Sequence, residues 1–337
     1  MSNFKHNQTA HCENGVTMSL LKHHGVDFMT EPLAFGMGSG LFYIHIPFLK
    51  VNNGPAISFR TMPGAIFKRT CKSLGVKVER KKFKSKEAAQ LFLDQKISDG
   101  VPVGCQVGVF HLPYFPKEYR FHFNAHNLIV FGKEDNRYLV SDPVMEVTTT
   151  LSPDELQKVR FAQGALAPKG HLYFPVSVGE ISLDTLQKGI IKGIKRNCRD
   201  MLHVPGGIAG VKGIKHTAKK IRTWRDKLGD KQAALYLGQI VRMQEEIGTG
   251  GGGFRFLYAA FLEEASVILG NTELLEVSEK ITKAGDLWRD SALQMSGIYK
   301  GRLTSQKDYD DSADLLIEIS NLEKEAFMQL SKIKFNR

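Results

Sequence analysis

The chain has 337 residues, of which 42% are hydrophobic, 24% charged and 9% aromatic, and its formal net charge is +11. This composition is typical of a soluble globular protein, and the length indicates two domains of ordinary size, each able to bury its own core. The sequence has no apolar run of about eighteen residues, and its polar N-terminus lacks the apolar segment of a signal peptide. We therefore expect no membrane-spanning helix and a cytoplasmic location.

The positive charge is concentrated in two stretches. Residues 188–231 hold thirteen Lys or Arg against three Asp, and a second basic run covers residues 68–86. Such patches attract anionic partners, although solvated helix faces are an equal alternative. Only Phe83 and Trp224 interleave with the basic residues and no recognition motif appears, so we expect neither nucleic acid nor a membrane as the partner.

The four cysteines are scattered: Cys12, Cys71, Cys105 and Cys198. They form no CxxC pair and no zinc-binding spacing, which argues against a disulfide framework. We expect no metal and no cofactor. Cys105 lies in an apolar strand pattern and is interpreted as a core residue, whereas Cys71 and Cys198 lie in basic helical patterns without an evident catalytic partner.

The first predicted element is a helix of about three turns that begins at Cys12 and ends at a glycine C-cap, Gly25. A thiol at a helix N-terminus faces unpaired N–H groups and the positive end of the helix dipole, which favour the thiolate. Cys12 is therefore a candidate nucleophile. For a cysteine considered alone, a small buried core residue is the alternative.

The next stretch, residues 30–46, starts with a turn at Glu31-Pro32 and contains a glycine-rich FGMGSG segment before an extended apolar run, residues 41–46. The glycines match neither a phosphate-binding loop nor a dinucleotide fingerprint, so a tightly packed loop is expected. Glu31 stands beside this loop and is a candidate to bind a substrate amine, with a solvated surface charge as the alternative.

The middle of the chain alternates helical and strand patterns. We expect helices at residues 64–74, at 86–100 after a Ser85 cap, and after Ser152, whose SPDE start forms a capping box. Strands are expected at residues 76–80, 101–107, 127–131 and 138–140, the last two joined by a polar turn. This pattern indicates an antiparallel sheet with associated helices.

From Ser182 onward only helical periodicity remains. We place a domain boundary near Gly179, giving a catalytic domain at 1–178 and a mostly α-helical domain at 179–337. Within the second, residues 248–255 read GTGGGGFR between two helices. The N–H groups of the following helix and Arg255 in its first turn form a candidate carboxylate-binding site for substrate, with a flexible linker as the alternative.

Three residues together carry the candidate chemistry. His126 opens an apolar strand and Asp142 ends the next one, so an antiparallel hairpin makes them neighbours. A helix docked on this sheet brings the Cys12 thiol to the same edge, supplying a nucleophile, a base and a carboxylate that orients the base. Taken singly, His126 is also explained as a sheet-edge histidine and Asp142 as a turn residue.

This order of residues resembles the papain-like cysteine peptidases of the bacteriocin-processing kind. The chain more closely resembles the butirosin biosynthesis protein H family, on the stretches AHCENGVTMSLLKHHGVDFMTEPLAFGMGSGLFY and HNLIVFGKEDNRYLVSDP. The helical half, with GTGGGGFRFLYAAFLEEA, resembles the uncharacterised domain that often follows it. The resemblance implies an α+β, papain-like cysteine-peptidase fold, with a helix packed on an antiparallel sheet, followed by the helical domain.

The resemblance also implies an activity. The butirosin protein is an acyltransferase of secondary metabolism that moves an aminoacyl group from an acyl carrier protein thioester to an aminoglycoside amine. In this chain it implies Cys12 as acyl acceptor, His126 as acid and base, and Asp142 as the residue that orients His126. Papain-like enzymes place an oxyanion-hole glutamine about six residues before the cysteine, whereas Gln8 lies four before Cys12, so the second oxyanion donor is left open.

Three functions follow as hypotheses. The first is an acyltransferase that takes an acyl thioester, on a carrier protein or coenzyme A, and a small-molecule amine acceptor. The second is a hydrolase of the same fold, a peptidase or amidase, including a variant in which cleavage after His11 frees Cys12. The third is a non-catalytic binding protein. The sequence leaves the oligomeric state open.

Overall fold

The computed structural model describes residues 3–51 and 54–335 and divides into two compact units. The first unit comprises Met1–Ala34 and Ile66–Leu186, and the second Phe35–Ala65 and Gln187–Arg337. The first is an antiparallel sheet with helices and the second is mostly helical, so the predicted α+β class with a helical C-terminal part is confirmed. The predicted domain boundary is a single one near Gly179, whereas the structure groups Phe35–Ala65 with the helical part.

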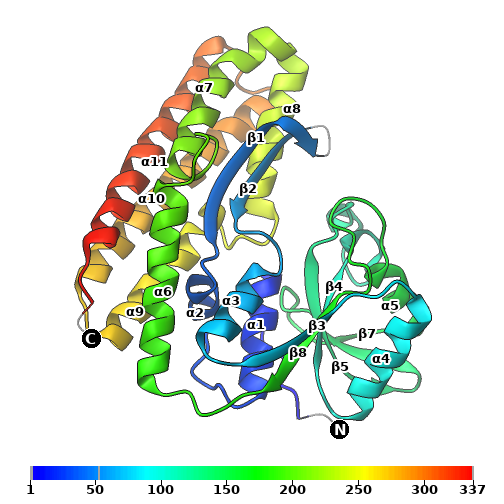
Figure 1. The fold of residues 1–337 in the computed structure, drawn as a ribbon. Coiled ribbons are helices and arrows are strands. Elements are labelled where there is room, and N and C mark those ends of the chain that lie inside the picture. Colours follow the sequence, from blue (N-terminus) through cyan, green and yellow to red (C-terminus); the bar gives the residue numbers. More distant parts are fainter. Residues whose placement is uncertain (1–2, 52–53, 336–337) are drawn as a thin grey trace. The chain divides into compact units, whose positions relative to one another are not determined.

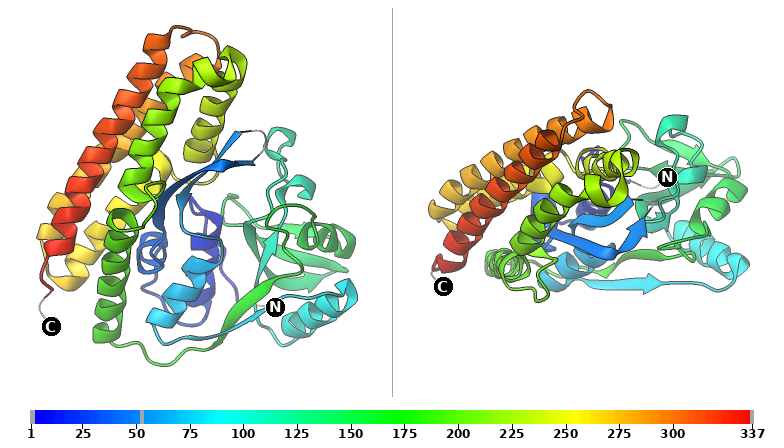
Figure 2. Two further views of the ribbon diagram at one scale, coloured as in Figure 1. Left: turned by 45° about the horizontal axis from the view of Figure 1, so that its top comes forward. Right: turned by 90° about the horizontal axis from the view of Figure 1, so that it is seen from above.

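The sheet of the first unit has six strands in the order β3-β8-β4-β5-β6-β7, and every pair is antiparallel (Figure 1, Figure 2). The strands are β3 (Lys77–Lys81), β4 (Val103–Val107), β5 (His126–Glu134), β6 (Arg137–Ser141), β7 (Thr149–Leu151) and β8 (Leu172–Ser177). The predicted hairpin is β5–β6. Its turn residues Asp135 and Asn136 have φ of 45° and 58°, which suits a tight hairpin turn.

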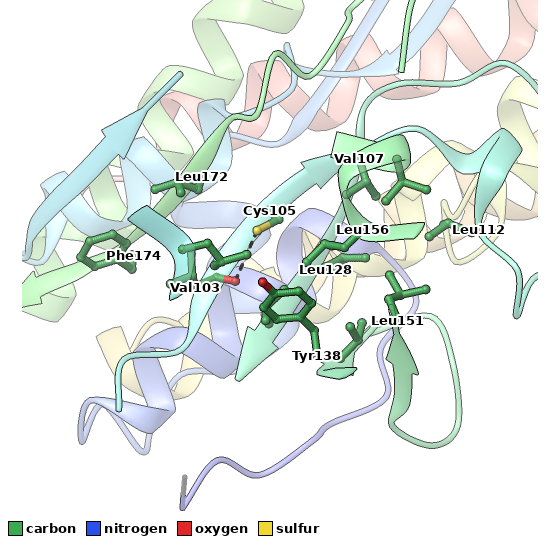
Figure 3. Close-up of a cluster of buried hydrophobic side chains, with 14 residues drawn as sticks. Val103, Cys105, Val107, Leu112, Leu128, Tyr138, Leu151, Leu156, Leu172 and Phe174 are labelled. Carbon is green, nitrogen blue, oxygen red and sulfur yellow. Dashed lines mark hydrogen bonds between the residues drawn. The ribbon is translucent and has the colours of Figure 1, made fainter. Parts of the chain in front are cut away.

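Helices cover both faces of this sheet. Helices α4 (Lys86–Ser98) and α5 (Pro153–Arg160) supply Leu93 and Leu156 to a core that includes Cys105, so the predicted core role of that cysteine is confirmed (Figure 3). Side chains alternate along a strand, so the residues between these core positions face the other way, where α1 (Cys12–His23) contacts β4, β5 and β8. The remaining helical segments of this part of the chain are α2 (Glu31–Met37), α3 (Ala65–Ser73), η1 (Val109–His111) and η2 (Lys117–Tyr119).

Local sequence signals explain where these helices begin. The Ser85 side chain accepts the Ala88 N–H and caps α4, as predicted. Ser152 and Glu155 form the predicted capping box of α5, in which each side chain accepts the backbone N–H of the other residue. Each such cap satisfies N–H groups that the first helical turn leaves without a partner.

The second unit is built from long helices and one hairpin. Its elements are β1 (Leu41–Val51), β2 (Gly54–Arg60), α6 (Leu183–Leu202), α7 (Gly210–Leu228), α8 (Asp230–Val241), η3 (Arg242–Glu246), η4 (Gly252–Phe254), α9 (Arg255–Leu269), α10 (Glu273–Tyr299) and α11 (Gln306–Lys332). Helix α10 packs against α9 and α11, and α7 packs against α11 (Figure 2). The hairpin belongs here because β1 contacts α7 and β2 contacts α8. None of the helices in residues 3–51 and 54–335 is long and apolar enough to cross a membrane.

The glycine-rich segment of this unit forms a left-handed turn. Gly250 to Gly253 all have positive φ, and Phe254 follows with φ 72°. The turn places Arg255 at the start of α9 with its guanidinium inside the unit, where it is fully buried. The left-handed conformation strains any side chain other than glycine, which explains the four consecutive glycines.

The prediction that Arg255 binds substrate is wrong. Its Nε and Nη2 donate to the two carboxylate oxygens of Glu323 at 2.8 and 3.0 Å, and its Nη1 donates to the Gly253 carbonyl. Trp288 Nε1 also donates to Glu323, at 2.7 Å. Because Arg255 and Glu323 are both completely buried, this guanidinium stabilises the fold of the helical unit.

Replacing Glu323 tests this role. Glu323→Gln leaves the buried Arg255 charge without its counter-charge, and we expect it to lower the free energy of unfolding by about 3 kcal/mol. Urea denaturation measures the change. The matched control is Glu325→Gln on the same helix, which removes an exposed ion pair with Lys280 and should leave the unfolding midpoint close to wild type. Equal effects of both substitutions would contradict the assignment.

Candidate active site

The candidate nucleophile stands at the N-terminus of α1, as predicted. The helix begins at Cys12, the His11 side chain caps it by accepting the Asn14 N–H, and Gly25 follows its end with φ 84°. The thiol is buried, with 5% of the residue exposed. Because Cys12 is the first helical residue, no carbonyl of its own helix accepts its backbone N–H.

The β5–β6 hairpin brings His126 and Asp142 together. His126 Nε2 donates to Asp142 Oδ2 at 2.7 Å, and both residues are buried. The register explains the meeting, because Ile129 pairs with Ser141, so one step further Asp142 lies opposite Leu128, two residues from His126. The predicted neighbourhood of these two side chains is thus observed.

A register shift in this hairpin decides which way Asp142 faces. Gly132 pairs with Leu139 but Val130 pairs with Val140, so β5 has one extra residue between these pairs. A β-bulge of this kind moves all later residues of the partner strand by one position, which reverses the face to which each side chain points. With the shift, Asp142 shares the face of Leu128 and His126.

Two further groups hold the Asp142 carboxylate. The Tyr114 hydroxyl donates to Oδ2 at 2.8 Å, and the Val144 N–H donates to Oδ1 at 3.2 Å. Burial, the Asp142 charge and this hydrogen bond raise the Tyr114 pKa well above its usual value, so the hydroxyl keeps its proton and remains a donor. Tyr114 was not predicted from the sequence, although it lies in an aromatic segment shortly before His126.

The electrostatics of the site favour a protonated His126. Burial by itself lowers the pKa of this imidazole, but the charges of Asp142 and Cys12, together with hydrogen bonds to both, raise it to about 10. Since Nε2 is engaged by Asp142, Nδ1 is the nitrogen available to Cys12. The three predicted residues therefore form one connected set, with an imidazolium between a carboxylate and a sulfur.

Glu31 lies close to Cys12 and binds the backbone before it. Its Oε2 accepts the Ala10 N–H at 2.9 Å and its Oε1 accepts the His11 N–H at 2.8 Å. Burial raises the Glu31 pKa, while these backbone hydrogen bonds oppose the rise. The carboxylate thus fixes the two residues before Cys12, and its binding of a substrate amine stays a prediction.

A close approach beside Cys12 depends on Gly15. A Cβ at this position would lie 2.1 Å from Thr9 Oγ1 and 2.4 Å from Pro143 Cβ, so any larger residue would push both away. The Thr9 N–H also donates to the Pro143 carbonyl at 2.7 Å. The segment before Cys12 and the segment after Asp142 therefore meet on α1.

Asn127, which was not predicted from the sequence, is a polar neighbour of the Cys12 sulfur. Its Nδ2 lies 3.8 Å from Cys12 Sγ. The only sequence signal is its position, as a polar residue between His126 and an otherwise apolar strand.

The other three cysteines, Cys71, Cys105 and Cys198, are not part of the set formed by Cys12, His126 and Asp142. Burial raises the pKa of Cys71 and of Cys198 to about 12, and it also raises the pKa of Cys105. Within residues 3–51 and 54–335 no group of three or more His, Cys, Asp or Glu side chains is arranged to hold a metal ion.

A cysteine at a helix N-terminus, packed on an antiparallel sheet whose hairpin supplies a histidine and an aspartate, defines a papain-like cysteine domain. Residues 154–330, more than half of the chain, match the family described as "Domain of unknown function (DUF4872)", and the chain belongs to this family. Residues 11–143 match the family described as "Butirosin biosynthesis protein H, N-terminal", which confirms the predicted resemblance.

Solved structures and curated proteins provide two further comparisons. Among solved structures, the chain is similar to a candidate C39-like peptidase from Bacillus anthracis, with 14% identity and a TM-score of 0.37, over 53% of this chain and 98% of the other. No curated protein matches the chain.

Alkylation tests whether the site activates its thiol. Iodoacetamide at neutral pH is expected to modify Cys12 and to spare Cys71, Cys105 and Cys198, whose thiols burial keeps protonated. Peptide mass spectrometry locates the label. His126→Ala should slow the reaction at least about tenfold, because it removes the cation beside the sulfur. Labelling spread evenly over the four cysteines would contradict this account.

Histidine-selective NMR titration tests the charge state of His126. In the wild-type protein its pKa should be near 10, far above the usual 6.5, and Asp142→Asn and Cys12→Ala should each lower it by removing a negative partner. An acid step that uses the imidazolium then operates at neutral pH and is lost as the pH rises through about 10. A wild-type His126 that titrates near 6.5 would show that the pair is absent.

Proposed function

We propose that this protein is a cysteine-dependent acyltransferase that forms an amide or ester from an acyl thioester through an acyl-enzyme on Cys12. The observation that supports it most is the connected set of Cys12, His126 and Asp142, in which His126 is protonated at neutral pH. The choice of acyl transfer draws on the match of residues 11–143 to the butirosin protein H family.

The first half-reaction loads the enzyme. The Cys12 thiolate attacks the carbonyl carbon of the thioester, a carbon–sulfur bond forms, and the carbonyl electron pair moves onto oxygen. The Cys12 backbone N–H at the start of α1 is a donor for this oxyanion. When the carbonyl re-forms, the bond to the donor sulfur breaks, and the leaving thiolate takes the proton of the His126 imidazolium.

The second half-reaction releases the product. An amine attacks the acyl carbon on Cys12, and neutral His126 accepts a proton from the nitrogen. The bond between the acyl carbon and Cys12 Sγ then breaks, the amide departs, and the thiolate–imidazolium pair is restored. Asp142 retains its charge throughout and stabilises the imidazolium in both resting and leaving-group steps. A hydroxyl acceptor gives an ester, and water gives hydrolysis.

The basic surface of the helical unit supports an anionic acyl donor, a carrier protein or coenzyme A. Exposed lysines follow one side of α6, at Lys192 and Lys195, and one side of α7, at Lys212, Lys215 and Lys219. Positive surface of this kind steers an anionic partner by long-range attraction and makes its association sensitive to salt. The donor and the small-molecule amine acceptor are both part of the proposal.

Intact-protein mass spectrometry tests the acyl-enzyme. Incubation of the protein with an acyl thioester of N-acetylcysteamine should add the mass of one acyl group, and peptide mapping should place it on Cys12. The same spectrum reports whether the residues before Cys12 are retained in the reactive protein. Cys12→Ala is expected to stay unlabelled, with Cys105→Ala as the control that labels like wild type.

The fate of the acyl group separates the hypotheses. Product that forms only after a primary amine is added supports the transferase, because the acyl-enzyme then waits for its acceptor. Acyl release at the same rate without amine supports the hydrolase. If the protein gains no acyl mass, or gains it equally after Cys12→Ala, both enzymatic hypotheses are contradicted. The remaining hypothesis is then the non-catalytic binding protein.

A further inference from the structure

The Asn127 side chain is held by three hydrogen bonds that fix which end of the amide faces the sulfur. The Tyr173 hydroxyl donates to Asn127 Oδ1 at 2.7 Å. Asn127 Nδ2 donates to the Ala125 carbonyl at 3.1 Å and to Cys12 Sγ at 3.8 Å. A carbonyl only accepts, so Nδ2 must be on the side of Ala125 and Cys12, and both amide hydrogens are used.

The sheet allows Tyr173 to reach Asn127 across an intervening strand. Tyr173 is on β8 and Asn127 on β5, with β4 between them. Gly104 of β4 pairs with Tyr173, and a Cβ at Gly104 would lie 2.6 Å from the Tyr173 ring. Because position 104 has no side chain, the phenol lies over the middle strand and its hydroxyl arrives at the amide.

The Tyr173 hydroxyl is a permanent donor in this environment. Burial, followed by the negative charges of Glu13 and Cys12, raises its pKa well above the usual value. A hydroxyl that keeps its proton always presents hydrogen to Asn127 Oδ1. The amide therefore presents N–H, and never its oxygen, to the sulfur.

We propose that Asn127, oriented by Tyr173, is a positioning residue that stabilises the Cys12 thiolate by donating an N–H to its sulfur from the side of the sheet. The proposal rests on the proposed function in that Cys12 is the nucleophile. His126 supplies a charge and a mobile proton, whereas Asn127 supplies a neutral donor that cannot give up its proton. The Asn127 N–H therefore remains beside the sulfur when His126 becomes neutral after acylation, and it stabilises the Cys12 thiolate that forms as the bond to the acyl carbon breaks.

The test follows the rate of Cys12 alkylation by iodoacetamide against pH, so it needs no substrate. Asn127→Ala should slow alkylation at neutral pH about tenfold and move the profile about one pH unit higher. Asn127→Asp keeps the shape but puts an acceptor and a charge beside the sulfur, so its shift should be larger. Tyr173→Phe, which removes only the hydroxyl, should shift the profile in the same direction by a smaller amount.

Asn124→Ala is the matched control. This amide is also buried, but it donates to the carbonyls of Gln163 and Ala165 and has no contact with Cys12. Its alkylation profile should superimpose on that of wild type, with folding of every variant checked by circular dichroism.

Profiles of Asn127→Ala, Asn127→Asp and Tyr173→Phe that superimpose on wild type would overturn the proposal. If Asn127→Ala fails to fold, Tyr173→Phe decides alone. The outcomes remain distinct from those of the proposed function, because shifted alkylation without any acyl adduct on the wild-type protein would remove the acyltransferase and leave the role of Asn127 standing.

Discussion

The candidate site depends on one buried carboxylate. Asp142 has no exposed surface, and a charge so placed is tolerated only when hydrogen-bond donors replace water around it. Tyr114, His126 and the Val144 N–H supply these donors. Burial lowers the pKa of His126, but this carboxylate together with Cys12 raises it to about 10, which keeps a cation beside the sulfur at neutral pH. The aspartate thus acts on the nucleophile through His126, which lies between them.

The backbone of the β5–β6 hairpin determines where the Asp142 carboxylate lies. The β-bulge between Val130 and Gly132 turns Asp142 to the face of His126, and without it the two side chains would lie on opposite faces of the hairpin. On the helix side, Gly15 lets Thr9 and Pro143 reach α1 beside Cys12. The extra residue in β5 and the absence of a side chain at Gly15 of α1 therefore allow Cys12 and the His126–Asp142 pair to meet.

The sequence predicted the parts of the site that local signals encode. A glycine cap marks the end of the Cys12 helix, and a polar turn between apolar runs marks the β5–β6 hairpin, so Cys12, His126 and Asp142 could be found. The bulge leaves no such signal, because the alternation of side chains looks the same with either register. Asn127 and Tyr114 were missed because their roles come from contacts with residues distant in the chain.

The differences between prediction and structure have the same physical origin. A glycine run before Arg255 is typical of an anion-binding loop, but its partner Glu323 lies 68 residues away and buries the guanidinium. Glu31 stands beside a glycine-rich segment, yet backbone N–H groups twenty residues earlier occupy it. Phe35–Ala65 groups with the helical unit because β1 and β2 pack on α7 and α8, which no local pattern indicates.

The most direct test of the central claim is a pre-steady-state measurement of thiol release from an acyl thioester in the absence of an amine. A Cys12 acyl-enzyme predicts a rapid burst of about one thiol per protein molecule, followed by slow turnover that an added amine accelerates. Cys12→Ala should show no burst. A slow linear release without a burst, equal in the wild-type and Cys12→Ala proteins, would contradict the account.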